Sequence, residues 1–448
     1  MSPQRAAIIL AAGRNRRMKS SRSKVLHEVG GRTMLAWVGD LVRRSGMDRP
    51  VCVVGEADTD VRTAAQNLDM DIAVQELQSG TGHAVNVCRD MFEGFDGTVT
   101  VLYADTPLIR KDTLSRVFEA HDTGADTVVL GFETDEPGAY GRLVTDNEDL
   151  SAIVEAKEAT PEQLAITLCN SGVLSCNSQS LFSALSRVTN NNAKGEYYLT
   201  DIVGILRGDG KTARVVRSPE SEVLGVNSRH DLAKAEAAFQ DRKRMECLDR
   251  GVTLRDPDSV IFAYDTDIAR DVEIGANVVF GPGVSIATGT VIRSFCHVEG
   301  AIIGENVTIG PFARVRPGTH LGEGVQLGNF IETKKAAIGR HSKVSHLSYI
   351  GDAEVGENVN IGAGTVTCNY DGYFKHKTII GNGAFVGTHS SLVAPVTIGH
   401  GAFLGSGGVI TDNVPDDALA LGRARQVNRE GWARRYHMIM SRRKEQKT

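Results

Sequence analysis

The chain has 448 residues, enough for two or three domains with a large hydrophobic core. A hydrophobic content of 41% and a charged content of 23% are ordinary for a globular protein and exclude a mostly disordered chain. The net charge of −5 conceals a basic C-terminal tail that begins at Arg423, which is either a solvated end or a phosphate-binding arm.

The cysteines and the apolar runs indicate in which cellular compartment the protein is expected. Seven cysteines are present without paired CxxC spacing, which argues against a structural zinc site and predicts free thiols in a reducing cytoplasm. No apolar run approaches the length of a membrane span, and the N-terminus lacks a signal peptide. We therefore expect a cytoplasmic protein without a membrane partner.

Apolar runs alternate with helical patterns through the N-terminal half of the chain. In chain order, the predicted elements are strand 6–10, helix 34–44, strand 51–54, helix 60–68 and strand 99–103. This alternation is typical of βαβ units and predicts a Rossmann-like α/β domain over residues 1–227. Ligands of such open sheets bind beyond the carboxyl ends of the strands.

Two features follow these predicted strands. The loop after the first strand contains Gly13 among small residues, and Arg17 and Lys24 supply positive charge that suits a phosphate. It is neither a Walker loop nor a GxGxxG turn, and by itself a turn with exposed cations is more often an ordinary loop. Asp105 ends the third strand, where a carboxylate either holds Mg²⁺ against a triphosphate or caps the next turn.

These features belong to a series of short blocks that agree with one family in order and spacing. The blocks are Leu10-Ala11-Ala12-Gly13, Arg17-Met18, Lys24-Val25-Leu26, residues 75–78, Gly80-Thr81-Gly82-His83-Ala84, Asp105, Tyr140-Gly141-Arg142, Ile153-Val154-Glu155, Asn170-Ser171-Gly172, residues 196–201 and Gly225-Val226-Asn227. The first blocks resemble the sugar-1-phosphate nucleotidyltransferases. The later ones resemble the UDP-N-acetylglucosamine pyrophosphorylases within that family.

The resemblance implies uridylyl transfer from UTP to N-acetylglucosamine-1-phosphate, with Mg²⁺ as cofactor and pyrophosphate as the second product. It implies a nucleotide site formed by Leu10, Ala11, Ala12, Gly13, Lys24, Gln75, Gly80 and Thr81. It also implies catalytic cations Arg17 and Lys24, metal ligands Asp105 and Asn227, and sugar contacts Gly141, Glu155, Asn170 and Asn227. Such chemistry depends on positioning and charge neutralisation more than on an acid–base pair.

Three positions depart from the family pattern. Asn15 and Ala104 stand where the family usually has glycine, and Ser23 stands where it usually has proline. Asparagine tolerates left-handed backbone angles better than most residues, but its side chain adds bulk where a phosphate is expected.

A single helix is predicted between the two halves. Residues 228–248 are rich in Ala, Glu, Lys and Arg, and Ser228 is a plausible N-cap. We therefore expect a linker over residues 228–250 between two independently folded domains.

The C-terminal part repeats an apolar residue every six positions. The repeats are Ile268, Ile274, Phe280, Ile286 and Ile292, then Ile303, Ile309, Val315, Leu321 and Leu327, then Ile380, Val386, Leu392, Ile398, Leu404 and Ile410. A six-residue period fits neither a helix nor an alternating strand and predicts a parallel β-helix over residues 251–448. The rhythm lapses between Ile361 and Ile380, which predicts a loop that leaves the coil around residues 368–372.

Polar blocks on these repeats carry a second resemblance. They are residues 314–318, 328–330, Lys334-Lys335, residues 346–352, residues 358–364 and residues 367–372. They resemble the bacterial glucosamine-1-phosphate N-acetyltransferases, which are left-handed β-helices and homotrimers. The resemblance implies acetyl transfer from acetyl-CoA to glucosamine-1-phosphate, in a bifunctional enzyme that supplies precursors of peptidoglycan and lipopolysaccharide.

Attack on a thioester needs a neutral amine, and histidine has a suitable pKa for the base that takes the amine proton. An isolated histidine is more often a satisfied side chain, but the polar blocks around His346 favour catalysis. The resemblance implies sugar-phosphate contacts from Arg316, Lys334, Tyr349 and Asn360, and acetyl-CoA contacts from Asn369, Tyr370, Thr388, Ser406 and Arg423. Because the blocks of Lys334, Tyr349, Asn360 and Asn369 lie about one turn apart, we expect stacking to bring them into one cleft.

Two other interpretations remain open. One is a monofunctional sugar-1-phosphate nucleotidyltransferase whose β-helix is only an oligomerisation scaffold, although a scaffold does not need His346 or Lys334. The other is a non-enzymatic scaffold, or a nucleic-acid binder that uses the basic tail. The tail lacks regularly interleaved aromatics, so we expect no nucleic-acid partner.

Overall fold

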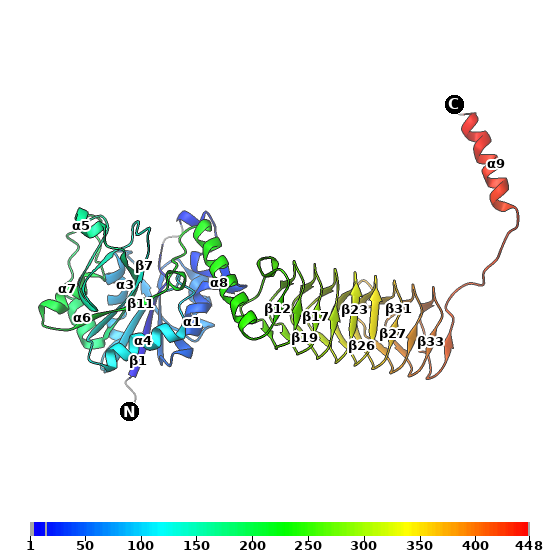
Figure 1. The fold of residues 1–448 in the computed structure, drawn as a ribbon, viewed down its shortest axis with the longest axis horizontal. Helices are drawn as coiled ribbons and strands as arrows, with labels where there is room; N and C mark the ends of the chain where they lie inside the picture. Colours follow the sequence, from blue (N-terminus) through cyan, green and yellow to red (C-terminus); the bar gives the residue numbers. More distant parts are fainter. Residues whose placement is uncertain (1–3, 14–15, 447–448) are drawn as a thin grey trace. The chain divides into compact units, whose positions relative to one another are not determined.

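The computed structural model describes residues 4–13 and 16–446. These residues form two compact units (Figure 1). The first contains the chain up to Glu246 together with Phe262–Tyr264, and the second contains Cys247–Ile261 and the chain from Asp265 onward. No helix in the described ranges is long and apolar enough to cross a membrane.

The first unit is built on a nine-stranded sheet. In sheet order the strands are β5 (Asp71–Gln75), β4 (Arg49–Gly55), β1 (Gln4–Leu10), β6 (Gly97–Tyr103), β10 (Leu168–Asn177), β7 (Thr127–Glu133), β11 (Ala213–Ser218), β9 (Asp149–Val154) and β8 (Arg142–Asp146). Strands β5, β4, β1 and β6 are parallel, whereas β10 runs antiparallel to β6 and β7. The three strands predicted from apolar runs correspond to β1, β4 and β6, so these three predictions are confirmed.

Helices cover both faces of this sheet. On one face lie α1 (Met34–Arg44), α2 (Thr59–Gln66) and α4 (Lys111–Asp122), and on the other lie α3 (Thr81–Asn86), α6 (Ser178–Leu185) and α7 (Asp201–Gly208). The alternation of side chains along β1 explains the two cores, because Ala7 and Ile9 face α1 while Ala6 and Ile8 face the opposite layer. The short helix α5 (Pro161–Leu164) buries no side chain. The predicted helix 34–44 is observed with those bounds, and the predicted helix 60–68 is observed as α2.

A long helix, α8 (Arg229–Asp249), follows the sheet and begins as predicted. Ser228 caps it, since its Oγ accepts a hydrogen bond from the Asp231 N–H and the Asp231 carboxylate accepts one from the Ser228 N–H. Its residues up to Glu246 belong to the first unit. Phe239 of α8 packs in a small core with Val29 and Met34.

Gly30 shows how closely α8 is packed. It has φ +59°, and a Cβ added there would lie 2.4 Å from the Phe239 ring. Gly46 also has a positive φ, +69°, but a Cβ added there would have no other atom within 4 Å. The two glycines therefore share the left-handed backbone, and only Gly30 has a close neighbour.

We expect Gly30→Ala to destabilise the first unit more than Gly46→Ala does. Both substitutions place alanine in a left-handed conformation at a cost of about 1–2 kcal/mol, and only the first also overpacks Phe239, which adds about 1–3 kcal/mol. Thermal unfolding followed by tryptophan fluorescence measures this, because Trp37 makes an edge-to-face contact with Phe239. Equal unfolding midpoints for the two variants would show that the Phe239 ring simply moves aside.

The second unit is a left-handed parallel β-helix. Its ten-stranded sheet, called side A below, is β12 (Thr253–Leu254), β14 (Glu273–Ile274), β17 (Val291–Ile292), β20 (Thr308–Ile309), β23 (Gln326–Asn329), β25 (Lys343–His346), β27 (Asn360–Ile361), β30 (Phe385–Val386), β33 (Phe403–Leu404) and β35 (Leu419–Ala420). All its neighbouring strands are parallel.

The other two sides form one fourteen-stranded sheet, because β24 and β26 run around a corner. Side B consists of β15 (Val279–Phe280), β18 (His297–Val298), β21 (Arg314–Val315), the first parts of β24 (Glu332–Ile338) and β26 (Tyr349–Val355), β28 (Val366–Cys368), β31 (Ser391–Val393) and β34 (Val409–Ile410). The third side consists of β13 (Asp267–Ile268), β16 (Ser285–Ile286), β19 (Ala301–Ile303), β22 (Thr319–Leu321), the second parts of β24 and β26, β29 (Thr378–Ile380) and β32 (Val396–Ile398).

Every aliphatic or aromatic residue of the predicted six-residue repeat is at most 5% exposed, so the β-helix prediction is confirmed. Ile274 pairs with Ile292, and Ile292 pairs with Ile309, so the same side chain type stacks from coil to coil. The predicted loop is also observed. Ala353 pairs directly with Thr378, and residues 369–377 stand outside the coil between β28 and β29.

The corner between sides A and B carries a column of exposed side chains. Phe295, Phe312, Phe330 and Leu347 occupy it, all with positive φ between 52° and 62°. Neighbouring phenylalanine rings are stacked, with centroids 5.0 and 5.3 Å apart. The chain continues after the last coil to α9 (Trp432–Glu445) (Figure 1), and this helix buries none of its residues.

Candidate functional sites

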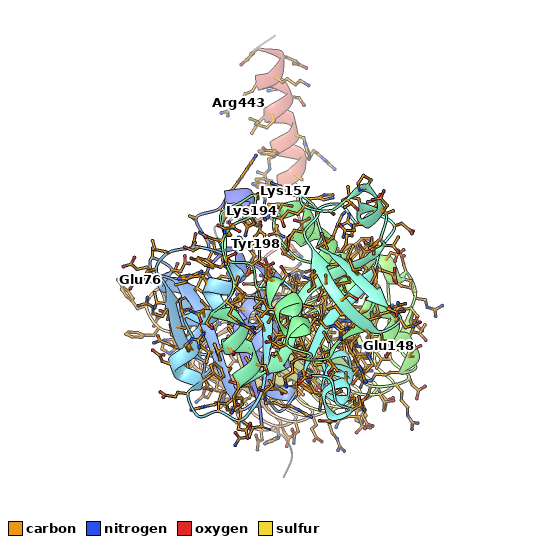
Figure 2. All side chains as sticks on the ribbon, turned by 90° about the vertical axis from the view of Figure 1, so that its left-hand side faces the viewer. Glu76, Glu148, Lys157, Lys194, Tyr198 and Arg443 are labelled. Atoms are coloured by element: carbon orange, nitrogen blue, oxygen red, sulfur yellow. The ribbon has the colours of Figure 1, made fainter. Side chains whose placement is uncertain are left out.

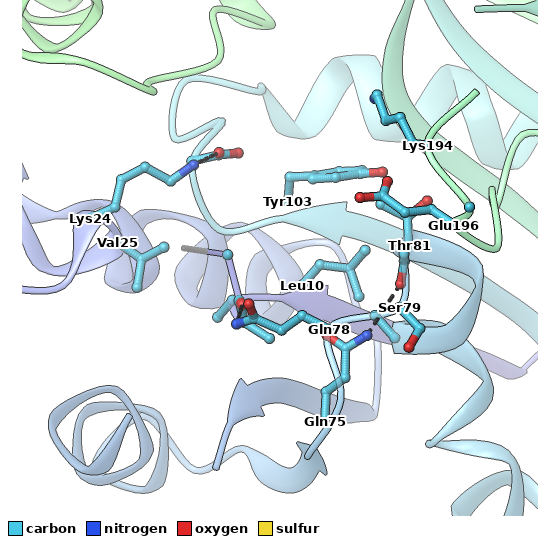
Figure 3. A pocket seen from close by; sticks show the side chains of 17 residues that line it. Leu10, Lys24, Val25, Gln75, Gln78, Ser79, Thr81, Tyr103, Lys194 and Glu196 are labelled. Atoms are coloured by element: carbon cyan, nitrogen blue, oxygen red, sulfur yellow. Dashed lines mark hydrogen bonds and ion pairs between the residues drawn. The ribbon is translucent and has the colours of Figure 1, made fainter. Parts of the chain in front are cut away.

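A cavity of about 690 Å³ opens at the carboxyl ends of β1, β5 and β6. All eight residues predicted to bind the nucleotide line it, namely Leu10, Ala11, Ala12, Gly13, Lys24, Gln75, Gly80 and Thr81. Figure 3 shows Gln75, Gln78, Ser79 and Thr81 along one side of the cavity and Lys24 at its opposite end. The topology therefore brings together residues that are far apart in the chain.

One end of the cavity is held rigidly by hydrogen bonds. The Gln75 side chain is 4% exposed, and its Nε2 donates to the Gly80 carbonyl at 3.2 Å and to His83 Nδ1 at 3.1 Å. Thr81 Oγ1 accepts a hydrogen bond from the Leu199 N–H at 3.1 Å. Gly80 has φ +113°, and a Cβ there would lie 2.5 Å from the Tyr197 carbonyl oxygen, so this position needs glycine.

Cations and oxygen ligands meet at the other end. The Lys24 ammonium forms an ion pair with Asp105, and these side chains are only 12% and 15% exposed. Lys24 Nζ also donates to Asn227 Oδ1 at 3.1 Å, and Arg17 Nη2 donates to the same oxygen at 2.9 Å. Four residues predicted as catalytic or metal-binding are thus linked by hydrogen bonds, although neither Arg17 nor Asn227 lines the cavity.

The Asp105 and Asn227 oxygens are suitably arranged to bind a metal ion. They converge on one point that the Lys24 ammonium, itself a cation, now fills. Carboxylate and amide oxygens are the ligands that Mg²⁺ prefers, and Mg²⁺ is commonly held by one or two protein groups plus substrate phosphates and water. The described part of the chain has no cluster of three or more His, Cys, Asp or Glu side chains suited to a metal. The donor set at Asp105 therefore fits a magnesium ion shared with a phosphate ligand.

The predicted sugar contacts lie next to the cavity. The Asn170 N–H donates to the Gly141 carbonyl at 2.8 Å, and Glu155 accepts a hydrogen bond from Thr200. Tyr103 connects this group to the cavity that it lines. Burial raises the pKa of the Tyr103 hydroxyl, and the nearby Asp105 and Glu155 carboxylates raise this pKa further.

Sequence reasoning did not assign several residues that line the cavity, among them Gln78, Ser79, Tyr103, Lys194 and Glu196. Tyr103 was detectable, because it ends the strand that leads to Asp105. Gln78 and Glu196 lie in the matching blocks 75–78 and 196–201 but were given no role, whereas Lys194 comes from a loop outside those blocks. The Lys194 Nζ lies 5.5 Å from the centroid of the Tyr198 ring, and Figure 2 shows both at the same edge of the first unit.

Two of the three departures from the family pattern fit their loops. Ser23 has φ −56°, an angle that proline also adopts, and it precedes the short helix Lys24–Leu26. Ala104 is fully buried with a negative φ, and its N–H donates to the Leu10 carbonyl at 3.1 Å. Neither residue strains the backbone. Asn15 lies outside the described residues.

On the β-helix, His346 lies at the end of its side A strand, just before the corner. Its Nδ1 is 2.7 Å from Asn329 Oδ1. Thr388 and Ser406 occupy the same place on later coils. The backbone hydrogen bonds show this, because the residue that follows each of these positions donates its N–H to the equivalent carbonyl of the preceding coil. Gly364 donates in this way to His346, and Gly407 donates to Thr388. Arg423 Nη1 donates to the Ser406 carbonyl at 2.9 Å.

Side B carries most of the predicted sugar-phosphate residues. Arg316 pairs with Glu332 at 2.8 Å, and Lys334 lies in register with Gly351. Asn369 Nδ2 donates to the Tyr349 hydroxyl at 3.5 Å and to the Asp352 carboxylate.

Tyr370 lies in the protruding loop, where Lys375 Nζ stacks over its ring at 4.4 Å from the centroid. The expectation of one cleft is only partly confirmed, since Lys334, Tyr349 and Asn369 lie together on side B. Asn360 is on side A with His346, whereas Lys334 and Tyr349 are on side B, because successive hexapeptides occupy successive sides of the coil.

Comparisons with known proteins agree with both halves. Residues 7–198 match the MobA-like NTP transferase domain. Residues 300–330 match the bacterial transferase hexapeptide family, and residues 377–412 match the hexapeptide repeat of succinyl-transferase.

Full-length relatives cover the whole chain. A protein of Maricaulis maris is 53% identical over 448 residues, which are 100% of this chain and 99% of the relative. A protein of Paramagnetospirillum magneticum is 48% identical over 449 residues with the same coverage, and one of Azorhizobium caulinodans is 51% identical over 428 residues, 95% of this chain and 96% of the relative. Each carries the name bifunctional protein GlmU. The family resemblance inferred from the motifs is confirmed, and this chain belongs to the bifunctional GlmU proteins.

Proposed function

We propose that this chain acetylates glucosamine-1-phosphate with acetyl-CoA and then transfers a uridylyl group from UTP to the N-acetylglucosamine-1-phosphate formed. The products are UDP-N-acetylglucosamine, pyrophosphate and free CoA, and the nucleotide sugar supplies peptidoglycan and lipopolysaccharide synthesis. The observation that carries the proposal is the cavity of the first unit, which all eight expected nucleotide residues line and at one end of which Lys24 contacts both Asp105 and Asn227.

In uridylyl transfer, a phosphate oxygen of the sugar phosphate attacks the α-phosphorus of UTP, and the bond to the pyrophosphate oxygen breaks on the opposite side. Arg17 and Lys24 would offset the charge of the triphosphate. Asp105 and Asn227 would hold Mg²⁺, which neutralises phosphate charge when bound. Lys24, whose ammonium pairs with Asp105 in this structure, would contact a phosphate oxygen of the bound nucleotide.

The remaining residues of the first unit would select the substrates. Gln75, Gly80 and Thr81 would bind uracil through the rigid end of the cavity. Gly141, Glu155 and Asn170 would bind N-acetylglucosamine beside Tyr103.

In acetyl transfer, the amine nitrogen attacks the thioester carbonyl carbon, and the carbon–sulfur bond of acetyl-CoA breaks. His346 would take the proton from the amine and return it to the departing thiolate. Arg316 and Lys334 would bind the sugar phosphate, with Tyr349 and Asn360 placing the sugar. Acetyl-CoA would contact Asn369, Tyr370, Thr388, Ser406 and Arg423.

The division of these residues between sides A and B supports a homotrimer, in which a neighbouring copy brings the two sets together. Exposed aromatic side chains support it as well. Phe312 and Phe330 at the corner are 46% and 53% exposed, and Phe385 and Phe403 stack on side A with centroids 4.6 Å apart. Stable subunit interfaces bury such aromatic surface. A solution mass by light scattering equal to three chains is expected, and a monomer would contradict this assembly.

The full reaction tests the proposal. We expect purified protein with glucosamine-1-phosphate, acetyl-CoA, UTP and Mg²⁺ to form UDP-N-acetylglucosamine, free CoA and pyrophosphate, as detected by mass spectrometry. Excess EDTA is expected to stop uridylyl transfer and leave acetyl transfer intact, because only the first site uses a metal. Absence of CoA release, with uridylylation of supplied N-acetylglucosamine-1-phosphate, would instead favour a monofunctional nucleotidyltransferase with a scaffold β-helix.

A further inference from the structure

Asn329 contacts the proposed base directly. Its Oδ1 lies 2.7 Å from Nδ1 of His346, and the two residues are paired in register between β23 and β25. An amide oxygen can only accept a hydrogen bond, so Nδ1 of a neutral His346 must carry the proton. The lone pair that can accept a proton is then on Nε2.

We propose that Asn329 is a positioning residue for acetyl transfer, which fixes the His346 imidazole in the tautomer whose Nε2 takes the proton of the attacking amine. This inference rests on the proposed role of His346 as the base. Asn329 itself touches neither substrate nor the reacting atoms. It acts through the ring orientation and the location of one proton.

The backbone brings the two side chains together. Gly328 precedes Asn329, and a Cβ at Gly328 would lie 1.8 Å from the Ser345 carbonyl oxygen, so only glycine permits this close approach of the two strands. Phe330 and Leu347 follow the pair with φ +57° and +52°, and the Leu347 N–H donates to the Asn329 carbonyl at 3.1 Å. Asn329 and His346 therefore hold equivalent places on successive coils, and their side chains leave the corner in the same direction.

The His346 backbone is also pinned from the other side. Its carbonyl accepts hydrogen bonds from the Gly364 N–H at 3.2 Å and from Ser348 Oγ at 2.9 Å. The next residue on the same column, Ala363, is small. At the positions equivalent to His346, the preceding coil therefore offers the Asn329 amide oxygen, a hydrogen-bond acceptor, and the following coil offers only the Ala363 methyl group. Among the described residues at these equivalent positions, Asn329 alone selects the His346 tautomer.

The neutral charge of Asn329 is part of the inference. The strands packed against β25 bring no titratable side chain, since β23 contributes Gln326 and Asn329 and β27 contributes Asn360. The other ionisable neighbours are Lys343 on the same strand, Tyr349 on β26, and Glu332 beside Tyr349, whose carboxylate is paired with Arg316. An aspartate at position 329 would accept the same hydrogen bond but would also stabilise the imidazolium.

The variants Asn329→Ala and Asn329→Asp distinguish the effect of orienting the His346 ring from the effect of the charge at position 329. We expect Asn329→Ala to lower kcat for CoA release about 10- to 100-fold with little change in KM, the usual loss when the partner that orients a functional histidine is removed. We expect Asn329→Asp to keep most of the activity at high pH. Its carboxylate raises the pKa of His346, so the acidic limb of the pH profile should move up by about one pH unit.

Gln326→Ala is the matched control, because Gln326 lies on the same strand but faces Lys343 instead of His346. Retained uridylyl transfer and an unchanged unfolding midpoint check folding in each variant. Wild-type kcat in Asn329→Ala, or a wild-type pH profile in Asn329→Asp, would overturn the inference. His346→Ala separates the two levels of the argument. If that variant stays active, the proposed base is wrong, and if it is inactive while both Asn329 variants match wild type, only the role of Asn329 is wrong.

Discussion

His346→Ala is expected to slow acetyl transfer about 10²- to 10⁴-fold, the usual contribution of a general base, and to leave uridylyl transfer unchanged. The alanine removes the only imidazole held by Asn329, and the amine then loses its proton to water alone. The two activities are measured separately, by thiol release from acetyl-CoA with glucosamine-1-phosphate and by pyrophosphate release from UTP with N-acetylglucosamine-1-phosphate.

His320→Ala is the control for this variant, because His320 is another exposed histidine on a different side of the β-helix. It should retain both activities. Acetyl transfer at the wild-type rate in His346→Ala would remove His346 from the mechanism.

Asp105→Ala is expected to do the reverse. It removes one of the two protein groups that fit a metal and leaves the Lys24 ammonium without its ion-pair partner. Loss of a single well-placed electrostatic group costs about 10²- to 10³-fold in rate, so uridylyl transfer should fall by at least that factor. Acetyl transfer should be unchanged, since Asp105 belongs to the other compact unit.

A matched variant is Asp112→Ala, because the Asp112 side chain is 85% exposed at the start of α4 and does not line the cavity. It should behave like wild type. The assignment of two separate sites would be contradicted most strongly by the Asp105→Ala and His346→Ala results taken together. If either Asp105→Ala or His346→Ala abolished both activities in a folded protein, the two reactions could not belong to separate sites.

The strands and the coil were predictable because their signals are local and periodic. The run that became β1 is apolar on both faces, as a central parallel strand between two helical layers must be. The six-residue repeat led directly to the buried stacks of Ile274, Ile292 and Ile309. Ser228 was recognisable as a cap from its residue type and its position before a helical pattern.

The first site was also accessible from sequence, but for a different reason. Its residues resemble a family in order and spacing, and the open sheet then places them at one edge. What no pattern could supply was Lys194, because it reaches the cavity from an irregular loop outside the matching blocks. The contact of Arg17 with Asn227, which are 210 positions apart, is equally invisible in a sequence.

The sequence by itself determined the two domain classes, the family and the chemical types of the site residues, because apolar periodicity and short motifs are properties of neighbouring residues. The tertiary structure decided which of these residues meet. It divided the acetyl-transfer residues between two sides of the coil, since each hexapeptide turns the chain through one corner. It also placed Asn329 under His346, because the strand register and the space left by Gly328 bring together residues one full coil apart.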